Sequence, residues 1–190
     1  MTSKEEIHDK VVSIRSAIGA SYSKPKPELV DDMRTALQTN EVALAYLRNE
    51  RALSDDTIKH FNLGYSQKYE AISIPIYKGK ELVNIKYRYL DPSKHDSVKY
   101  TSTRGCETWL YNEEGLSLAK ERGRVLIVEG EFDCMAVYQR GIRNVVSPAS
   151  GKDSYGVWVE LLDSIPEIYI AYDNDEGGKS TSKKFATRIG

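Results

Sequence analysis

The chain of 190 residues is long enough for one medium domain or two small ones, and 40% hydrophobic with 29% charged residues is ordinary globular composition, not that of a disordered or fibrous protein. Its net charge of −1 argues against a protein that binds nucleic acid through an overall positive charge. Since the sequence lacks an apolar run of about 20 residues and an apolar signal-peptide core, we expect a cytoplasmic protein, in a bacterium or a phage-infected host cell, with no membrane partner.

The first part of the chain predicts helices joined by a linker. Residues 4–18 carry apolar side chains at helical spacing, which predicts a short amphipathic helix. Pro25 and Pro27 break that pattern before a second helical stretch around Leu29–Leu37. We therefore expect residues 1–39 to form N-terminal helices and a linker.

A small α+β subdomain is expected over residues 40–120. Asn40 and Ser54 are suited to cap two successive helices, and Gly64 is suited to end the second in a left-handed conformation. Alternating residues around the turn Lys78-Gly79-Lys80 then predict a β-hairpin, and a further strand is expected at Val98–Thr101. From Ile76 to Cys106 basic residues outnumber acidic ones, so this part of the subdomain is expected to present a basic surface.

From Arg124 onward the pattern changes to strands alternating with helices. The strands are expected in "RVLIVEG", "NVVSPAS" and "EIYIAYD", and the helices in "EFDCMAVYQRG", "SYGVWVELLDSI" and "GGKSTSKKFATRI". This alternation predicts an α/β fold with a parallel, doubly wound sheet over residues 121–190. The functional crevice of such a sheet lies beyond the carboxyl ends of its strands.

An unusual acidic cluster lies at one of those strand ends. Asp173, Asp175 and Glu176 fall within four residues, and two like charges about 4 Å apart repel by roughly 4 kcal/mol at an effective dielectric of about 20. If the strand before Glu129 is the neighbour of the strand before Asp173, these carboxylates share one crevice with Asp175 just above it. Such a site suits Mg²⁺, which favours carboxylates together with water and substrate phosphates.

Two simpler interpretations compete with a metal site. In the first, the acidic residues form only a solvated loop and a helix N-terminus, an explanation that is stronger for Glu131 and Asp133, in the first turn of a helix. The run Gly178-Lys179-Ser180 also suggests a nucleotide-binding P-loop, but that pattern requires glycine where Asp173 stands. Carboxylates at that place would repel phosphate in the absence of a metal.

The motifs "LIVEGEFDCMAV" and "YDNDEGG" together resemble the Toprim domain of DnaG-type primases, topoisomerases and some nucleases. The upstream segment "YLRNERALSDDTIKHFNLGYS" resembles the start of the primase RNA-polymerase core. "ISIPIYKGKELVNIKYRYLDP" and "KYTSTRGCETWLYN" resemble the basic subdomain that precedes Toprim, particularly in phage primase–helicases and Twinkle helicases. The resemblance covers about residues 40–190.

This resemblance implies a DNA primase that makes RNA primers on a single-stranded DNA template from NTPs, with Mg²⁺ or Mn²⁺ as cofactor and a replicative helicase as partner, in cis or in trans. It assigns Glu129, Asp173 and Asp175 to the catalytic metal centre, with Asp133 in support. The basic residues that it implies for nucleotide or template binding are Arg51, Lys86, Arg88, Lys99, Arg104, Lys152 and Lys179.

Two departures from the family pattern keep other functions open. No cysteine-rich zinc module precedes the core, and the chain stops near the helix after the Asp-x-Asp motif, so we expect an incomplete sheet in a fragment or a short protein. The alternatives are a non-catalytic module that binds single-stranded DNA or couples to a helicase, and a Toprim nuclease that uses the same carboxylates on water.

Overall fold

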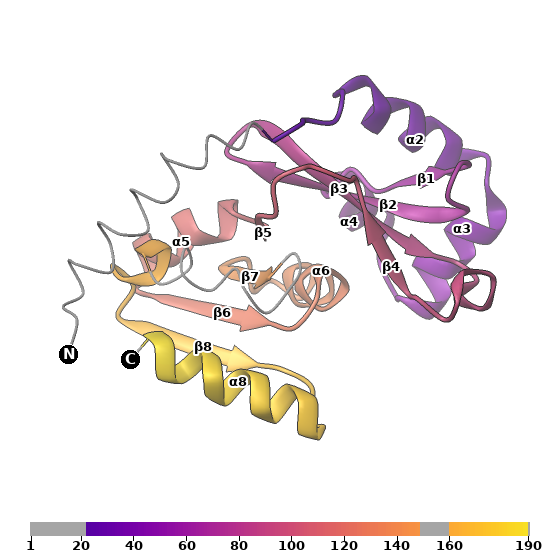
Figure 1. Ribbon diagram of the computed structural model, residues 1–190. Coiled ribbons are helices and arrows are strands. Elements are labelled where there is room, and N and C mark those ends of the chain that lie inside the picture. Colours follow the sequence, from indigo (N-terminus) through magenta and orange to yellow (C-terminus); the bar gives the residue numbers. More distant parts are fainter. Residues whose placement is uncertain (1–21, 149–159, 190) are drawn as a thin grey trace.

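The computed structural model describes residues 22–148 and 160–189, which form two four-stranded sheets (Figure 1). The strand orders are β1-β2-β3-β4 in the first sheet and β5-β7-β6-β8 in the second. The helix predicted at residues 4–18 lies outside the described residues. The same is true of residues 154–159, the first part of the helix predicted in "SYGVWVELLDSI".

The N-terminal helices are α2 (Glu28–Gln38), α3 (Glu41–Ala45), the π-helical η1 (Tyr46–Glu50) and α4 (Asp55–His60). Both predicted caps are confirmed, because the side chain of Asn40 accepts the backbone N–H of Ala43 and that of Ser54 accepts the backbone N–H of Thr57. These bonds satisfy amides that have no partner within the helix. The π-helical turn that continues α3 was not predicted.

The prediction for Gly64 is wrong. The left-handed residue after α4 is Asn62, with a φ of 50°, whereas Gly64 opens strand β1 (Gly64–Ser66). A Cβ atom at position 64 would lie 2.7 Å from the backbone carbon of Met33 on α2. Glycine is therefore required here because the helix packs directly on the strand, and not because of its backbone angles.

The predicted hairpin is confirmed as β2 (Ala71–Lys78) and β3 (Glu81–Tyr89), with Gly79 at a positive φ in the turn. A short 3₁₀-helix, η2 (Pro92–His95), leads to β4 (Tyr100–Ser102), which begins two residues later than predicted. All three pairings of the first sheet are antiparallel.

The second sheet contains β5 (Leu110–Tyr111), β6 (Arg124–Val128), β7 (Val145–Pro148) and β8 (Glu167–Ala171). Its helices with complete bounds are α5 (Glu114–Arg122), α6 (Glu131–Gln139) and α8 (Glu176–Ile189). The alternation predicted from Arg124 onward is confirmed, and β6 pairs in parallel with both β7 and β8. The short β5 joins the other side of β7 in antiparallel orientation, so the sheet is mixed at that edge.

The two sheets share one hydrophobic core. Leu47 and Ile72, from the N-terminal part, belong to the same buried cluster as Val128, Phe132 and Met135 from β6 and α6. Helix α6 thus packs against the N-terminal helices as well as its own sheet (Figure 1). This shared core fixes the position of the basic hairpin relative to the strand ends of the second sheet.

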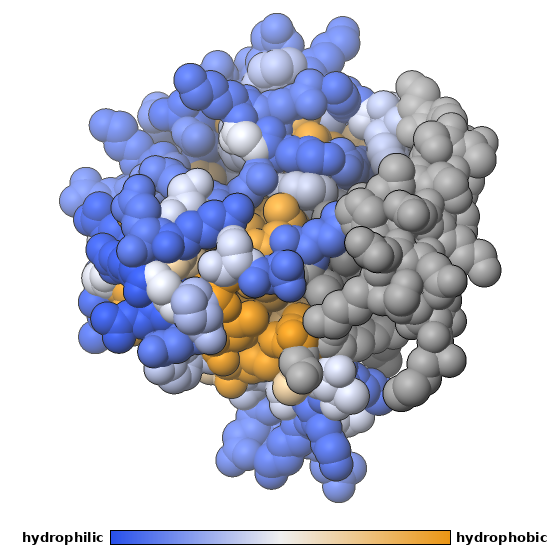
Figure 2. All heavy atoms as spheres, turned by 90° about the vertical axis from the view of Figure 1, so that its left-hand side faces the viewer, coloured by the Kyte–Doolittle hydropathy of each residue, from blue (hydrophilic) through white to orange (hydrophobic). Residues whose placement is uncertain are grey.

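On the side at the left of Figure 1, the visible surface of the described residues is mostly hydrophilic, with an apolar area near the centre of that face (Figure 2). Within residues 22–148 and 160–189, no helix has the length and apolar character needed to cross a bilayer.

Candidate metal and nucleotide site

The carboxylate of Glu129 and the backbone of Asp173 meet at the carboxyl ends of β6 and β8. These strands are parallel neighbours, with Val128 opposite Ala171, so the next residues leave the sheet at the same edge. The N–H of Asp173 donates a hydrogen bond to Oε2 of Glu129, with a distance of 2.9 Å. The predicted adjacency of the two strand ends is therefore confirmed, and both side chains are exposed.

Asp133 joins this pair from the first turn of α6. One of its oxygens, Oδ2, accepts the N–H of Gly130 at 3.1 Å and so fixes the turn between β6 and α6. Its pKa is raised from 3.8, mainly because the surrounding protein removes solvent from the carboxyl and then because the charge of Asp173 is near. The charge of Asp173 therefore disfavours ionisation of Asp133, and a bound cation would relieve that repulsion.

Asp175 has a structural role in addition to its predicted one. Its Oδ1 accepts the N–H of Gly178 at 2.7 Å, and its backbone carbonyl accepts the N–H of Lys179, so it caps helix α8. A Cβ atom at Gly178 would collide with the backbone carbonyl of Asp173. Two amides that would bind phosphate in a P-loop are thus already bonded within the loop, which agrees with the sequence argument against that motif.

The acidic strand ends are suited in donor chemistry to a hard divalent ion. Carboxylate oxygens are the ligands that Mg²⁺ and Mn²⁺ prefer, and Mg²⁺ is commonly held by one or two carboxylates with waters and phosphates. In the part of the chain that the structure describes, no group of three or more His, Cys, Asp or Glu side chains is arranged to hold a metal. Glu129, Asp133 and Asp173 lie at this edge, and Asp175 lies in the loop between β8 and α8.

Arg51 is held beside these acids by aromatic side chains. Its Nε donates to the hydroxyl of Tyr46 at 2.7 Å, and its guanidinium lies 4.6 Å from the ring centre of Phe132 on α6. The π-helical turn brings residues 46 and 51 together, since the N–H of Arg51 bonds to the carbonyl of Tyr46. The positive charge of Arg51 acts to lower the pKa of Asp133, so it lies within electrostatic reach of the acidic strand ends.

Lys86 and Arg88 approach the same place from β3. The Nζ of Lys86 lies 2.7 Å from Oε1 of Glu131 and 4.6 Å from the ring centre of Tyr100, and the Arg88 guanidinium lies 5.2 Å from that ring. The pKa of Tyr100 is raised to about 12, chiefly by its burial and then by the charge of Glu131. We call Arg51, Lys86 and Arg88 the basic cluster.

The other predicted basic residues are less closely associated with the basic cluster. The side chains of Lys99, Arg104 and Lys179 are exposed, and Lys99 contributes to the basic cluster only through its carbonyl oxygen, which accepts from Nη1 of Arg88. Lys152 lies outside the described residues. Sequence reasoning missed the aromatic residues of the site and the pairing of Glu131, because their role depends on contacts between distant elements.

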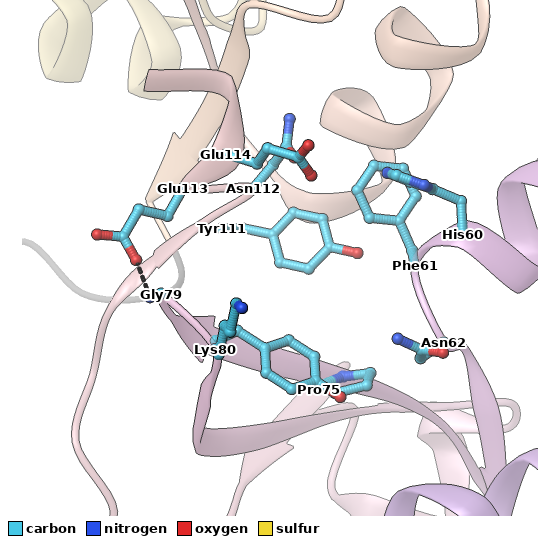
Figure 3. Close-up of a pocket in the computed structure, with 11 residues that line it drawn as sticks. His60, Phe61, Asn62, Pro75, Gly79, Lys80, Tyr111, Asn112, Glu113 and Glu114 are labelled. Carbon is cyan, nitrogen blue, oxygen red and sulfur yellow. Dashed lines mark hydrogen bonds between the residues drawn. The ribbon is translucent and has the colours of Figure 1, made fainter. Parts of the chain in front are cut away.

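A separate cavity of about 390 Å³ lies between the hairpin turn and the start of α5 (Figure 3). Its lining includes the aromatic residues Phe61, Tyr77 and Tyr111, and Glu113 accepts the N–H of Gly79 across it. None of the predicted site residues lines this cavity.

Comparisons with known proteins relate the chain to one domain family and to several primases. The Toprim domain family matches residues 123–189. The DNA primase of Aquifex aeolicus is 24% identical over 194 residues, which cover 80% of this chain and 39% of that protein. The primase homolog protein of Arabidopsis thaliana is 28% identical over 160 residues, which cover 74% of this chain and 45% of that protein. The chain thus spans less than half the length of these relatives.

Solved structures show the same fold. The zinc-binding and RNA-polymerase domains of the Aquifex aeolicus primase match with a TM-score of 0.76 at 22% identity, over 85% of this chain and 50% of that one. A DnaG primase catalytic domain bound to single-stranded DNA matches with a TM-score of 0.66 at 20% identity, over 83% of this chain and 62% of that one.

Proposed function

We propose that this chain is a primase RNA-polymerase core that joins NTPs on a single-stranded DNA template, because residues 123–189 match the Toprim domain family and the chain is similar to DNA primases. The phage primase–helicase branch, and a replicative helicase as partner, are part of this proposal. They are supported by the sequence of the basic subdomain, "KYTSTRGCETWLYN" included.

The observation that carries the proposal is the meeting of opposite charges at the first turn of α6. On one side of this turn, Asp133 lies within electrostatic reach of Asp173, which bonds to Glu129. On the other side, Phe132 and Glu131 contact Arg51 and Lys86 of the basic cluster. Phosphoryl transfer requires this combination, because its catalysis rests on positioning and on neutralising phosphate charge.

Each side of the site has a defined task in the proposed mechanism. Glu129, Asp173 and Asp175, supported by Asp133, would hold Mg²⁺ or Mn²⁺, which would neutralise phosphate charge and favour deprotonation of the primer 3′-hydroxyl. Arg51 and Arg88 would bind the triphosphate oxygens, since guanidinium groups match phosphate geometry. Because aromatic rings hold both arginines, little side-chain entropy is lost when the nucleotide binds.

The template is proposed to lie along the exposed basic residues. Lys99, Arg104 and Lys179 are exposed cations on three different segments, and Lys152 is a further candidate from the sequence. Such residues bind the phosphates of single-stranded nucleic acid without reading its sequence, so this binding should weaken steeply with salt. The similar fold of a DnaG catalytic domain that was solved with bound single-stranded DNA supports a single-stranded template as the ligand.

A priming assay tests the proposal. The full chain is incubated with single-stranded DNA, the four NTPs and Mg²⁺ or Mn²⁺, and short RNA products are separated on a gel. We expect products from the wild type and their reduction by about 10²–10³-fold or more in Asp173→Asn. Asp32→Asn, which changes an exposed acid on α2, serves as a control with unchanged activity.

Three results would overturn the proposal. Undiminished priming by Asp173→Asn would show that the metal-site assignment is wrong. Salt-sensitive DNA binding without any metal-dependent product would point to a binding module, and degradation of labelled strands without NTP incorporation would point to a nuclease.

A further inference from the structure

We infer that the ion pair between Lys86 and Glu131 is a positioning device that sets the spacing between the acidic strand ends and the basic cluster. This inference rests on the proposed function, because it concerns how a metal-bound triphosphate is held by both sides of the same site. It gives Lys86 a different role from the nucleotide contact that the sequence suggested.

The pair joins the two sheets of the molecule at a buried point. Lys86 lies on β3 of the first sheet, Glu131 begins α6 beside the second sheet, and their Nζ and Oε1 atoms are 2.7 Å apart. The side chains are only 14% and 2% exposed. Every other ion pair among the described residues has at least one side chain that is 25% or more exposed.

Burial makes this contact resistant to rearrangement. An ionised carboxylate that loses its partner inside a protein is costly, because water cannot replace the lost interaction. The N-terminal turn of α6 therefore stays at a fixed separation from β3. A solvated pair would permit many separations at similar free energy, since its charges interact weakly in water.

Each partner of the ion pair lies close in the chain to residues that are proposed to bind the metal or the triphosphate. Glu131 lies two residues after Glu129 and two residues before Asp133, so it is the middle residue of the acidic segment. Lys86 and Arg88 are two apart on β3 and thus project from the same face of that strand. Each partner is in this way rigidly linked to a residue proposed to bind either the metal or the triphosphate.

The surroundings of Lys86 also favour a positioning role over a ligand contact. Its ammonium group lies against Glu131 and 4.6 Å from the ring centre of Tyr100, so it is already held by a carboxylate and an aromatic ring. A nucleotide that took Lys86 as its contact would leave the buried carboxylate of Glu131 without this partner. Within the described part of the chain, Arg51 and Arg88 form no ion pair, so either can bind phosphate without leaving a buried carboxylate unpaired.

The test compares ATP binding with and without Mn²⁺ in single and double variants of the full chain. Lys86→Met and Glu131→Gln each remove one charge, and the double variant Lys86→Met/Glu131→Met replaces both with apolar side chains, so that one stable variant is obtained even if the single ones unfold. Lys78→Met is the matched control. Lys78 makes an ion pair with Glu107 at 2.9 Å and lies 4.0 Å from the ring centre of Trp109, but it is 41% exposed.

The measured quantity is the ratio of ATP affinity in excess Mn²⁺ to ATP affinity in EDTA, from equilibrium dialysis, with circular dichroism to establish that each variant is folded. For the wild type and Lys78→Met we expect a gain in the roughly 5–150-fold range of coupled sites. For the Lys86 and Glu131 variants we expect less than about a twofold gain, with Mn²⁺ binding in the absence of ATP retained. A contact with a purely structural role would change stability and leave this ratio intact.

Three outcomes overturn the inference, and they can be distinguished from one another. A full Mn²⁺-dependent gain in folded Lys86 and Glu131 variants contradicts the positioning role alone, as does a loss of ATP affinity in EDTA that is confined to Lys86→Met. Absence of any Mn²⁺-dependent gain in the wild type contradicts the proposed function and, with it, the inference.

Discussion

The acidic and basic sides of the candidate site are held in place by different kinds of contact. On the acidic side the carboxylates are exposed, and their positions depend on backbone amides, such as the N–H of Asp173 on Glu129 and that of Gly178 on Asp175. On the basic side the cations depend on side chains, with Arg51 held by Tyr46 and Phe132. The basic side is therefore set before a ligand arrives, whereas the acidic oxygens remain free to adjust around a metal.

This difference makes the two sides vulnerable to different substitutions. Removing a side-chain partner should damage the basic side, and adding a single Cβ atom to the loop should damage the acidic side. Preorganised charges contribute most to transition-state stabilisation when they need no rearrangement, so rigidity on the basic side has a catalytic use.

The largest expected effect on stability comes from breaking the buried ion pair. Lys86→Met should lower the free energy of unfolding by about 3–5 kcal/mol, because the carboxylate of Glu131 is left buried without its partner. Lys24→Met breaks the Lys24–Glu81 pair, whose side chains are both 55% exposed, and should cost no more than about 1 kcal/mol. Urea unfolding measures both, and equal losses in the two variants would refute the contrast.

The next effect concerns the close packing of the acidic loop. Gly178→Ala should destabilise by about 1–3 kcal/mol and weaken Mn²⁺ binding, since the added methyl group collides with the backbone of Asp173. Gly177→Ala is its neighbouring control, because a Cβ atom there meets only a side-chain oxygen of Asp175 at 3.3 Å. If both alanine variants unfold at the same urea concentration as the wild type, the loop accommodates the methyl group and the predicted collision with the Asp173 backbone is wrong.

A smaller effect separates the two roles of Asp175. Asp175→Ala should lower the free energy of unfolding by about 0.5–2 kcal/mol, because helix α8 loses its cap, whereas Asp175→Asn should keep the cap and the stability. Both variants should bind Mn²⁺ more weakly than the wild type if this carboxylate is a ligand. Urea unfolding and Mn²⁺ titration of the same samples measure the stability and the metal affinity of each variant. An unchanged Mn²⁺ affinity in Asp175→Asn would show that Asp175 only caps the helix.

The smallest expected effect is a pH-dependent gain in the stability of the protein when Asp133 is replaced by Asn. Partial burial and Asp173 raise the pKa of Asp133, so its ionised form is disfavoured in the folded protein and stability falls as pH rises through that pKa. Asp133→Asn should therefore be more stable than the wild type at pH 7 without metal, and this advantage should vanish below about pH 3.8, where the wild-type carboxyl is protonated in both states.

Thermal unfolding at several pH values would measure that advantage. Adding Mg²⁺ at pH 7 should reduce it, since only the wild type gains from the cation. An Asp133→Asn variant that is less stable than the wild type at pH 7 without metal would contradict the electrostatic argument.

Local patterns in the sequence were sufficient for much of the fold. The caps Asn40 and Ser54, the turn at Gly79 and the alternation from Arg124 onward all depend on residues close in sequence, and the structure confirms them. The two-residue strand β5 escaped prediction because it is too short to show a period and is defined by its pairing with β7. The prediction for Gly64 was wrong because glycine is required there by the close approach of Met33, which lies 31 positions earlier in the chain.

The candidate site was predictable to a similar extent. Glu129 and Asp173 each end a strand, and the parallel pairing of β6 with β8 brings them together as expected. The pairing of Lys86 with Glu131 across 45 positions left no local signal, because a lysine on a strand and an acid at a helix start each have ordinary explanations. Contacts between sheets thus set the basic side, and no single segment encodes them.

Mn²⁺ binding to the full chain tests most directly whether the two strand ends share an ion. The signal of free Mn²⁺ in electron paramagnetic resonance is titrated with the wild type, Glu129→Gln and Asp173→Asn. A shared ion predicts saturable binding to the wild type and a loss of at least about tenfold in affinity in each variant, because one carboxylate ligand is removed. Equal binding by all three proteins, or none by the wild type, would contradict it.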